Sequence, residues 1–135
     1  MKKIILTALV LLPFCLLAQN KKALDPANQI KQFWFVLLKK GPVRNQDSLT
    51  AAKIQAGHMA NINRLYEAGT LKVAGPFAEE NLAQGLFIFD CASKSELETL
   101  LQTDPAIKSG RLVAEIHPWY TAPIGSFTPG KPKKS

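Results

Sequence analysis

A histidine on the expected buried face of a helix is the first candidate for chemistry in this sequence. When residues 48–68 are placed on a helical wheel at about 100° per residue, one stripe roughly 80° wide collects the following side chains: Ala51, Ile54, His58, Ile62 and Leu65. Imidazole titrates near neutral pH, so a semi-buried histidine can act as a general acid or base. The alternative is a structural histidine held by hydrogen bonds, and the pattern taken alone favours that role.

A catalytic His58 needs a carboxylate partner, and four acidic residues are candidates. Glu67 lies nine residues further along the same helix, or roughly 900°, which places it on the opposite helix face. Asp104 is therefore the preferred partner, reached across space from the turn after the second expected helix, where it would fix the tautomer of His58. The alternative role of Asp104 is to cap a helix. Asp90 and Glu115, at strand positions, remain further options.

Other residues are candidates for binding a small molecule near His58. Gly75 and Pro76 are expected to form a turn beside the mouth of a pocket, where backbone N–H groups are available to an anion. Arg44 and Lys39 are cations that can attract an acidic substrate, although solvated loop charges are the ordinary case. The candidate substrate-binding residues are Trp34, Gly75, Pro76 and His117. His117 precedes Pro118, so its alternative role is to end a strand.

The sequence offers little for metals or cofactors. It has only two histidines and no clustered carboxylates or thiols, so we expect no metal site. It also lacks G-x-G-x-x-G, a P-loop, a nucleophile elbow and C-x-x-C, which argues against cofactor-dependent redox chemistry and phosphoryl transfer. We therefore expect no cofactor.

Hydrophobic periodicity and turn residues predict six main elements. Strands are expected over 32–38, 70–74, 85–91 and 111–117, and helices over 48–68 and 94–101. The second helix begins with a capping-box pattern at Ser93 and Glu96. Asp104 and Pro105 are expected to start a short helical turn that ends at Gly110. Pro118 is expected to end the last strand.

This order of elements predicts an α+β fold, the ferredoxin-like βαββαβ sheet with two helices on one face. The first and third strands would be central, and both are apolar on both faces. Because two helices cover only one face, something else must cover the other. A second copy of the sheet in a two-fold dimer is the simplest candidate. The alternative is that residues 121–135 fold back over this face.

The two ends of the chain are expected to lie outside the domain. Residues 1–18, with a basic start and an apolar stretch of about 14 residues, resemble a secretory signal peptide and are short for a membrane span. Residues 19–30 read as a flexible linker, 31–120 as the domain and 121–135 as a tail rich in proline and lysine. We expect an exported protein, periplasmic or secreted, with no stable membrane span after signal removal. A lipoprotein anchored through Cys15 is the alternative.

Signal removal also changes the charge and the thiol content. The chain has 17 lysines and arginines against 10 acidic residues, a net charge of +7, which falls to +5 without Lys2 and Lys3. No basic stripe is interleaved with aromatic residues, so we expect no nucleic-acid binding. Cys91 would remain as a single cysteine, so an intramolecular disulfide is excluded and a buried, inert thiol is expected.

Several segments, taken in order and spacing, resemble the YCII-related (YciI-like) family. They are 31–42, 57–62, 73–77, Asp104-Pro105 with Gly110, and 115–120. The resemblance implies a dimeric ferredoxin-like α+β barrel and a proposed His-Asp active site, with His58 at the position of the helix histidine. A related branch of the family includes a dehydrochlorinase that acts on chlorinated hydroxyhydroquinones. The signal peptide and long tail depart from the usual compact cytoplasmic member.

Together these observations predict an exported homodimer that binds a small aromatic or lactone-like molecule. In this hypothesis His58 and Asp104 transfer a proton in an elimination or isomerisation. The alternative is a non-catalytic ligand-binding or accessory domain in which His58 is structural.

Overall fold

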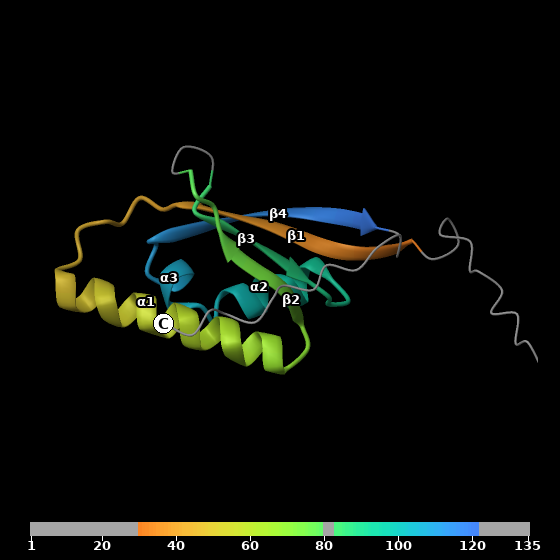
Figure 1. Cartoon of the computed structure of the whole chain (residues 1–135), viewed down its shortest axis with the longest axis horizontal. Coiled ribbons are helices and arrows are strands. Elements are labelled where there is room, and N and C mark those ends of the chain that lie inside the picture. Colours follow the sequence, from red (N-terminus) through yellow and green to blue (C-terminus); the bar gives the residue numbers. More distant parts are fainter. Residues whose placement is uncertain (1–29, 80–82, 122–135) are drawn as a thin grey trace, which may run out of the picture.

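The computed structural model describes residues 30–79 and 83–121. In this part of the chain four strands form one antiparallel sheet in the order β2-β3-β1-β4, and three helices lie on one face of it (Figure 1). The elements are β1 (Lys31–Lys40), α1 (Ser48–Glu67), β2 (Leu71–Pro76), β3 (Gly85–Phe89), α2 (Lys94–Leu101), α3 (Pro105–Lys108) and β4 (Leu112–Thr121). The predicted α+β ferredoxin-like fold is confirmed, with β1 and β3 in the centre of the sheet.

The predicted signal peptide (1–18), nearly all of the predicted linker and the tail from residue 122 lie outside the described residues. Among the helices that are described, none is both long enough and apolar enough to cross a membrane.

Local hydrogen bonds explain where the helices begin and end. Asp47 caps α1 by accepting from the backbone N–H of Thr50 at 2.9 Å. After α1 the chain turns at Gly69, whose φ of +75° is a conformation that glycine adopts without strain. Ser93 caps α2 by accepting from the backbone N–H of Glu96 at 3.1 Å, as the capping-box pattern predicts.

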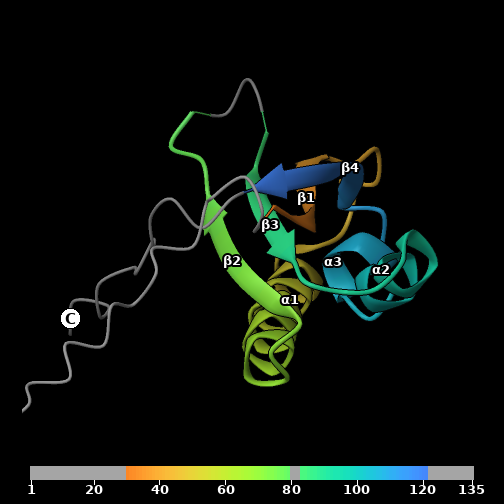
Figure 2. The same ribbon diagram turned by 90° about the vertical axis from the view of Figure 1, so that its right-hand side faces the viewer.

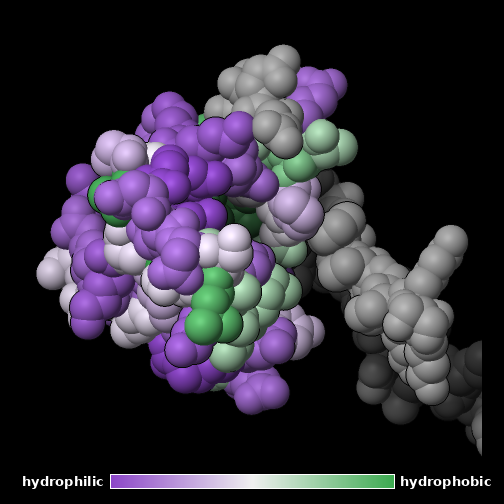
Figure 3. Space-filling model, turned by 90° about the vertical axis from the view of Figure 1, so that its left-hand side faces the viewer, coloured by the Kyte–Doolittle hydropathy of each residue, from purple (hydrophilic) through white to green (hydrophobic). Residues whose placement is uncertain are grey.

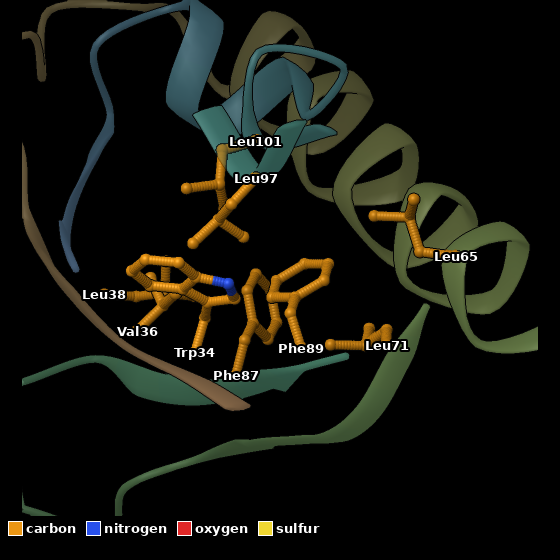
Figure 4. Packing of buried hydrophobic residues seen from close by; sticks show 9 residues of the cluster. All are labelled: Trp34, Val36, Leu38, Leu65, Leu71, Phe87, Phe89, Leu97 and Leu101. Carbon is orange, nitrogen blue, oxygen red and sulfur yellow. The ribbon is translucent and has the colours of Figure 1, made fainter. Parts of the chain in front are cut away.

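The core lies between the sheet and the helices. Nine residues form its buried cluster, and Figure 4 shows the sheet side chains directed toward α2 and α1. They are Trp34, Val36 and Leu38 from β1, Phe87 and Phe89 from β3, Leu71 from β2, Leu65 from α1, and Leu97 and Leu101 from α2. Alternation along β1 therefore places Trp34, Val36 and Leu38 on the helix side.

The opposite face of the sheet carries Phe33, Phe35 and Leu37 from β1. Trp119 of β4 packs beside the two phenylalanines, with ring centroids 6.3 Å from Phe33 and 6.5 Å from Phe35. No described helix covers this face, as the end-on view in Figure 2 shows. The expectation of an uncovered apolar sheet face is met within the described residues.

Two predicted strand ends are wrong. β4 does not end at Pro118 but continues through it to Thr121, with Pro118 paired opposite Trp34. β2 likewise includes Gly75 and Pro76, which pair opposite Leu86 and Gly85. Both are edge strands, where a proline can turn its nitrogen away from the ladder and cost no inter-strand hydrogen bond.

Candidate acid-base site

The central feature of the site is a buried hydrogen-bonded pair between α1 and the N-terminus of α3. His58 Nδ1 lies 2.7 Å from Asp104 Oδ2, across 46 residues of sequence. Asp104 is 1% exposed and His58 is 8% exposed. The structure therefore brings together the two residues named as candidate catalytic residues.

Asp104 uses both carboxylate oxygens. Oδ2 contacts His58, and Oδ1 accepts from the backbone N–H of Ala106 at 2.8 Å, which makes Asp104 the N-cap of α3. The two roles that the sequence left as alternatives thus coexist in one side chain. Because an ionised carboxylate only accepts hydrogen bonds, we assign the proton to His58 Nδ1. The neutral ring then has its acceptor nitrogen at Nε2.

Close helix packing holds this pair in place. Gly57 lies against α3, where a Cβ on Gly57 would fall 2.9 Å from Pro105 Cγ. One turn further along α1, the buried Asn61 accepts through Oδ1 from Thr103 Oγ1 at 3.0 Å and from Arg64 Nη2 at 2.7 Å. Thr103 immediately precedes Asp104, so its hydrogen bond to Asn61 holds the segment that leads to Asp104 against α1.

The His58 ring also lies beside a cavity. It stacks on Phe87 of β3, with ring centroids 6.0 Å apart and an interplanar angle of 28°. The cavity has a volume of about 370 Å³ and is bordered by residues from β1, α1, β2, β3 and α3 and by the loops before α1 and β4. His58 lines the cavity, and no described residue hydrogen-bonds to its Nε2.

The charged residues that line the cavity are Arg44 and Arg111, which lie there together with His58. Arg111 Nη1 donates to Gln46 Oε1 at 2.7 Å, and Arg44 Nη1 donates to the carbonyl oxygen of Arg111 at 3.3 Å. Figure 3 views the molecule from the end where α1 begins and shows a hollow with hydrophobic residues among hydrophilic ones. The cavity thus combines an apolar floor with a basic border.

The candidate binding residues fall into two groups. Gly75 and Pro76 line the cavity with His58, although they do so from strand β2 and not from the predicted turn. Trp34 does not line it, because its ring packs beneath Leu97 and its Nε1 donates to the carbonyl oxygen of Cys91 at 3.1 Å. Trp34 shares the helix-facing side of β1 but lies toward the opposite end of the strand from Leu38, which does line the cavity.

His117 also lies away from the cavity. It is paired opposite Phe35 on the sheet face that the helices leave uncovered, and its Nε2 is 2.8 Å from Glu115 Oε1. Lys39 contacts the other Glu115 oxygen rather than the cavity. The hydrogen bond from Lys39 lowers the pKa of Glu115.

The remaining acidic candidate, Asp90, is engaged elsewhere. It accepts from Lys31 Nζ at 2.7 Å and lies 3.6 Å from Lys72 Nζ. The hydrogen bond from Lys31 lowers the pKa of Asp90. Neither Asp90 nor Glu115 contacts His58, so Asp104 is the carboxylate within hydrogen-bond distance.

Several residues of the site were not anticipated from the sequence. Arg111, Gln55 and Phe87 line the cavity, and the hydrogen bond between Thr103 and Asn61 supports the pair of His58 and Asp104. A signal existed for Asn61, since it lies three residues after His58 and so shares its helix face. The same spacing holds for Gln55, three residues before His58, whereas the approach of Arg111, Phe87 and Thr103 to the site depends on contacts distant in sequence.

In the described part of the chain, no group of three or more His, Cys, Asp or Glu side chains is placed to hold a metal ion. The Cys91 thiol, predicted to be buried, is partly exposed. Burial raises the pKa of the Cys91 thiol to about 11.

The sheet, the helices on one face and the buried pair beside a cavity define a ferredoxin-like α+β protein with a cavity of ligand size. Residues 33–120 match the YCII-related domain. The chain therefore belongs to the YCII-related family, as the sequence resemblance indicated. The sequence matches no curated protein sequence.

The solved structures that are similar to this chain include the following two. One is a muconolactone isomerase, with a TM-score of 0.57 and 18% identity, covering 72% of this chain and 97% of that one. The other is the 5-chloro-2-hydroxyhydroquinone dehydrochlorinase of Burkholderia phenoliruptrix AC1100, in complex with 2,5-dihydroxybenzoquinone. Its TM-score is 0.47 and its identity 19%, covering 64% of this chain and 92% of that one. The likeness to the isomerase shows a shared fold.

Proposed function

We propose that this protein is a small-molecule enzyme that uses His58 as a general base and acid. The observation that carries the proposal is the 2.7 Å contact between His58 Nδ1 and Asp104, which leaves Nε2 available to the cavity. A base in this arrangement is oriented by a carboxylate that also stabilises the imidazolium once it forms.

The proposed reaction begins when Nε2 removes a proton from an acidic carbon of the bound molecule. The C–H electron pair stays on the substrate as an enolate, and His58 becomes an imidazolium paired with Asp104. In an isomerisation the imidazolium returns the proton to a different carbon. In an elimination the electron pair forms a double bond, a leaving group departs as an anion, and His58 later loses the proton to water.

The proposed substrate is a small cyclic or aromatic compound. Its size is consistent with a cavity of about 370 Å³, at the lower end of the range for ligand pockets. The solved muconolactone isomerase offers a precedent for this style of reaction on the same fold. No cofactor is part of the proposal.

A non-catalytic role is the second candidate, and the burial of the pair favours it. His58 and Asp104 are both nearly inaccessible, and both Asp104 oxygens are satisfied within the protein. In this second candidate role, the pair of His58 and Asp104 is purely structural and joins α1 to α3. In that case the cavity binds a ligand and His58 orients it or holds the core.

We further propose that the protein is exported and forms a homodimer through the uncovered sheet face. Support for the dimer comes from the apolar side chains Phe33, Phe35 and Trp119 on that face. Support for export comes from the signal-like sequence of residues 1–18. A lipid anchor at Cys15 is the alternative form of the exported protein.

The catalytic proposal is tested by proton exchange into D₂O, followed by NMR on a panel of small lactones, cyclic enones and chlorinated hydroquinones. Halide release reports elimination in the same samples. The wild type is expected to accelerate exchange or release for one of these classes. His58→Asn is expected to reduce that rate by about 10²–10⁴-fold, as for loss of a general base.

Glu67→Gln is the matched control, because Glu67 lies on the exposed face of the same helix and should leave the rate unchanged. The melting temperature of each variant separates loss of chemistry from loss of folding. A folded His58→Asn variant that is as fast as the wild type would refute catalysis by His58. Absence of turnover throughout the panel would favour the binding role.

A further inference from the structure

The two arginines that line the cavity lie in two loops that are joined by backbone hydrogen bonds. Arg44 lies in the loop before α1, and Arg111 immediately precedes β4. The backbone N–H of Gly41 donates to the carbonyl oxygen of Arg111 at 2.8 Å, and that of Val43 donates to Gly110 at 3.1 Å. A Cβ on Gly41 would collide with the Gly110 carbonyl oxygen, so glycine permits this close approach. The arginines are thus placed on a fixed border of the cavity.

Both guanidinium groups have neutral partners in the described residues. Arg111 donates to the Gln46 side chain, and Arg44 donates to a backbone carbonyl. Each guanidinium has five N–H donors, so most of their hydrogen-bonding capacity is unspent. No described aspartate or glutamate lines the cavity, and Asp104 is already occupied by His58 and Ala106. The cavity therefore has excess positive charge beside its candidate base.

We propose that Arg44 and Arg111 bind a carboxylate group of the substrate, which places an acidic C–H of the same molecule at His58 Nε2. This inference rests on the proposed function and adds the substrate class, a small cyclic or aromatic carboxylic acid. Planar guanidinium groups match carboxylate oxygens in geometry as well as charge. The same positive field lowers the cost of the negative charge that develops when the proton leaves.

The ordinary alternative is that these arginines are solvated loop charges. Two features argue against it: Arg111 is only partly exposed, and both arginines border the same cavity as the candidate base. Lys39 serves as a contrast, since it is a surface cation that is already paired with Glu115. A phosphate group has similar recognition chemistry and is therefore included as an arm of the test.

The test measures binding of three small carboxylates by calorimetry, namely benzoate, 2-furoate and crotonate. The corresponding amides and inorganic phosphate are measured in parallel. We expect at least one carboxylate to bind at least about tenfold more tightly than its amide. Arg44→Gln and Arg111→Gln should each weaken carboxylate binding by about tenfold or more and leave amide binding unchanged.

Lys53→Gln is the charge-matched control, because Lys53 is an exposed cation of α1 that does not line the cavity. It should bind carboxylates like the wild type. The inference is overturned if no carboxylate binds better than its amide, if both folded arginine variants bind like the wild type, or if phosphate binds and carboxylates do not.

His58→Asn separates this inference from the proposed function. Loss of proton exchange in that variant with carboxylate binding retained supports both statements. If carboxylate binding depends on the arginines while His58→Asn exchanges protons as fast as the wild type, the catalytic role of His58 fails and the anion site stands. If proton exchange depends on His58 while carboxylates bind no better than amides, the anion site fails alone.

Discussion

Gly57 of α1 lies in direct contact with Pro105 of α3, at a distance that leaves no room for a Cβ. This contact sets how closely the two helices approach, one residue before His58 and one residue after Asp104. The geometry of the hydrogen bond between His58 and Asp104 therefore depends on Gly57, which is not itself a partner in that bond.

Replacing Gly57 with valine should displace α3 and lengthen the contact between His58 and Asp104. Overpacking of this kind costs about 1–3 kcal/mol in the free energy of unfolding. Chemical denaturation measures the loss, and any turnover should fall with it. Ala60→Val, on the exposed face of α1, is the control and should cost about 0.5 kcal/mol through helix propensity alone. Equal losses in the two variants would contradict the packing role of Gly57.

Replacing Asp104 with asparagine should destabilise the protein, because it removes the charge from a hydrogen bond that is almost fully buried. Hydrogen bonds to charged groups contribute about 1.5–3 kcal/mol, so we expect a loss of about 2 kcal/mol in the free energy of unfolding. Glu67→Gln should remain within about 0.5 kcal/mol of the wild type. NMR of the His58 ring nitrogens should also show loss of the single Nδ1–H tautomer. A variant with unchanged stability and tautomer would remove the assigned role of Asp104.

The Cys91 thiol should react slowly at neutral pH, because its pKa is raised to about 11 by burial. The thiolate is the nucleophile, so the rate of alkylation by iodoacetamide should rise with pH until about 11. The measurement uses a Cys15→Ser variant, in which Cys91 is the only cysteine. Protein unfolded in denaturant is the control and should reach its maximal rate at lower pH. Rapid labelling of folded protein at pH 7 would contradict this prediction.

The raised pKa of the Cys91 thiol also makes the stability of the folded protein depend on pH. The pKa of the thiol in the folded protein lies above its ordinary value of 9.0, so the unfolded state loses this proton first as the pH rises. The contribution of Cys91 to stability is therefore present below pH 9 and decreases as the pH passes from 9 toward 11. Comparison with Cys91→Ser in the same Cys15→Ser background should show a difference in stability that shrinks over this interval.

Asp90 should stabilise the protein slightly at neutral pH, through Lys31 and Lys72. Its pKa is lowered in the folded state, so this contribution is present above its ordinary value of 3.8 and is lost as the pH falls through the lowered value. For a largely exposed pair we expect less than about 1 kcal/mol. The difference in unfolding free energy between wild type and Asp90→Asn should vanish at the acid end of the titration. A difference that persists there would show that the charge is not its cause.

Replacing Trp119 with glutamate should weaken the proposed homodimer, because it places a charge on the uncovered apolar face. Sedimentation velocity should give twice the chain mass for the wild type and a monomer for this variant. Tyr120→Glu is the matched control, since the next residue of the strand lies on the other side of the sheet, where Tyr120 donates to Gln32. A monomeric wild type at micromolar concentration would contradict the face-to-face dimer.

Much of the fold follows from the sequence because it depends on neighbouring residues. The spacing of Ile54, His58, Ile62 and Leu65 places the histidine on the inner face of a helix whatever that helix packs against. The caps at Ser93 and Asp104 are equally local. Strand order also followed, since the two most apolar strands had to be central. The ends of β2 and β4 could not be predicted from Pro76 and Pro118, because a proline is tolerated in a strand at the edge of a sheet.

The composition of the site was decided by the tertiary structure. The sequence by itself placed His58 inward, excluded Glu67 as its partner and favoured Asp104, but it left Asp90 and Glu115 as further options. Packing of α3 against Gly57 brings Asp104 to His58, while lysines engage the other two carboxylates. Packing likewise sent Trp34 into the core and His117 to the far sheet face, and it brought Arg111 to the cavity. Periodicity fixes which way a side chain faces, whereas contacts between distant segments determine what it meets there.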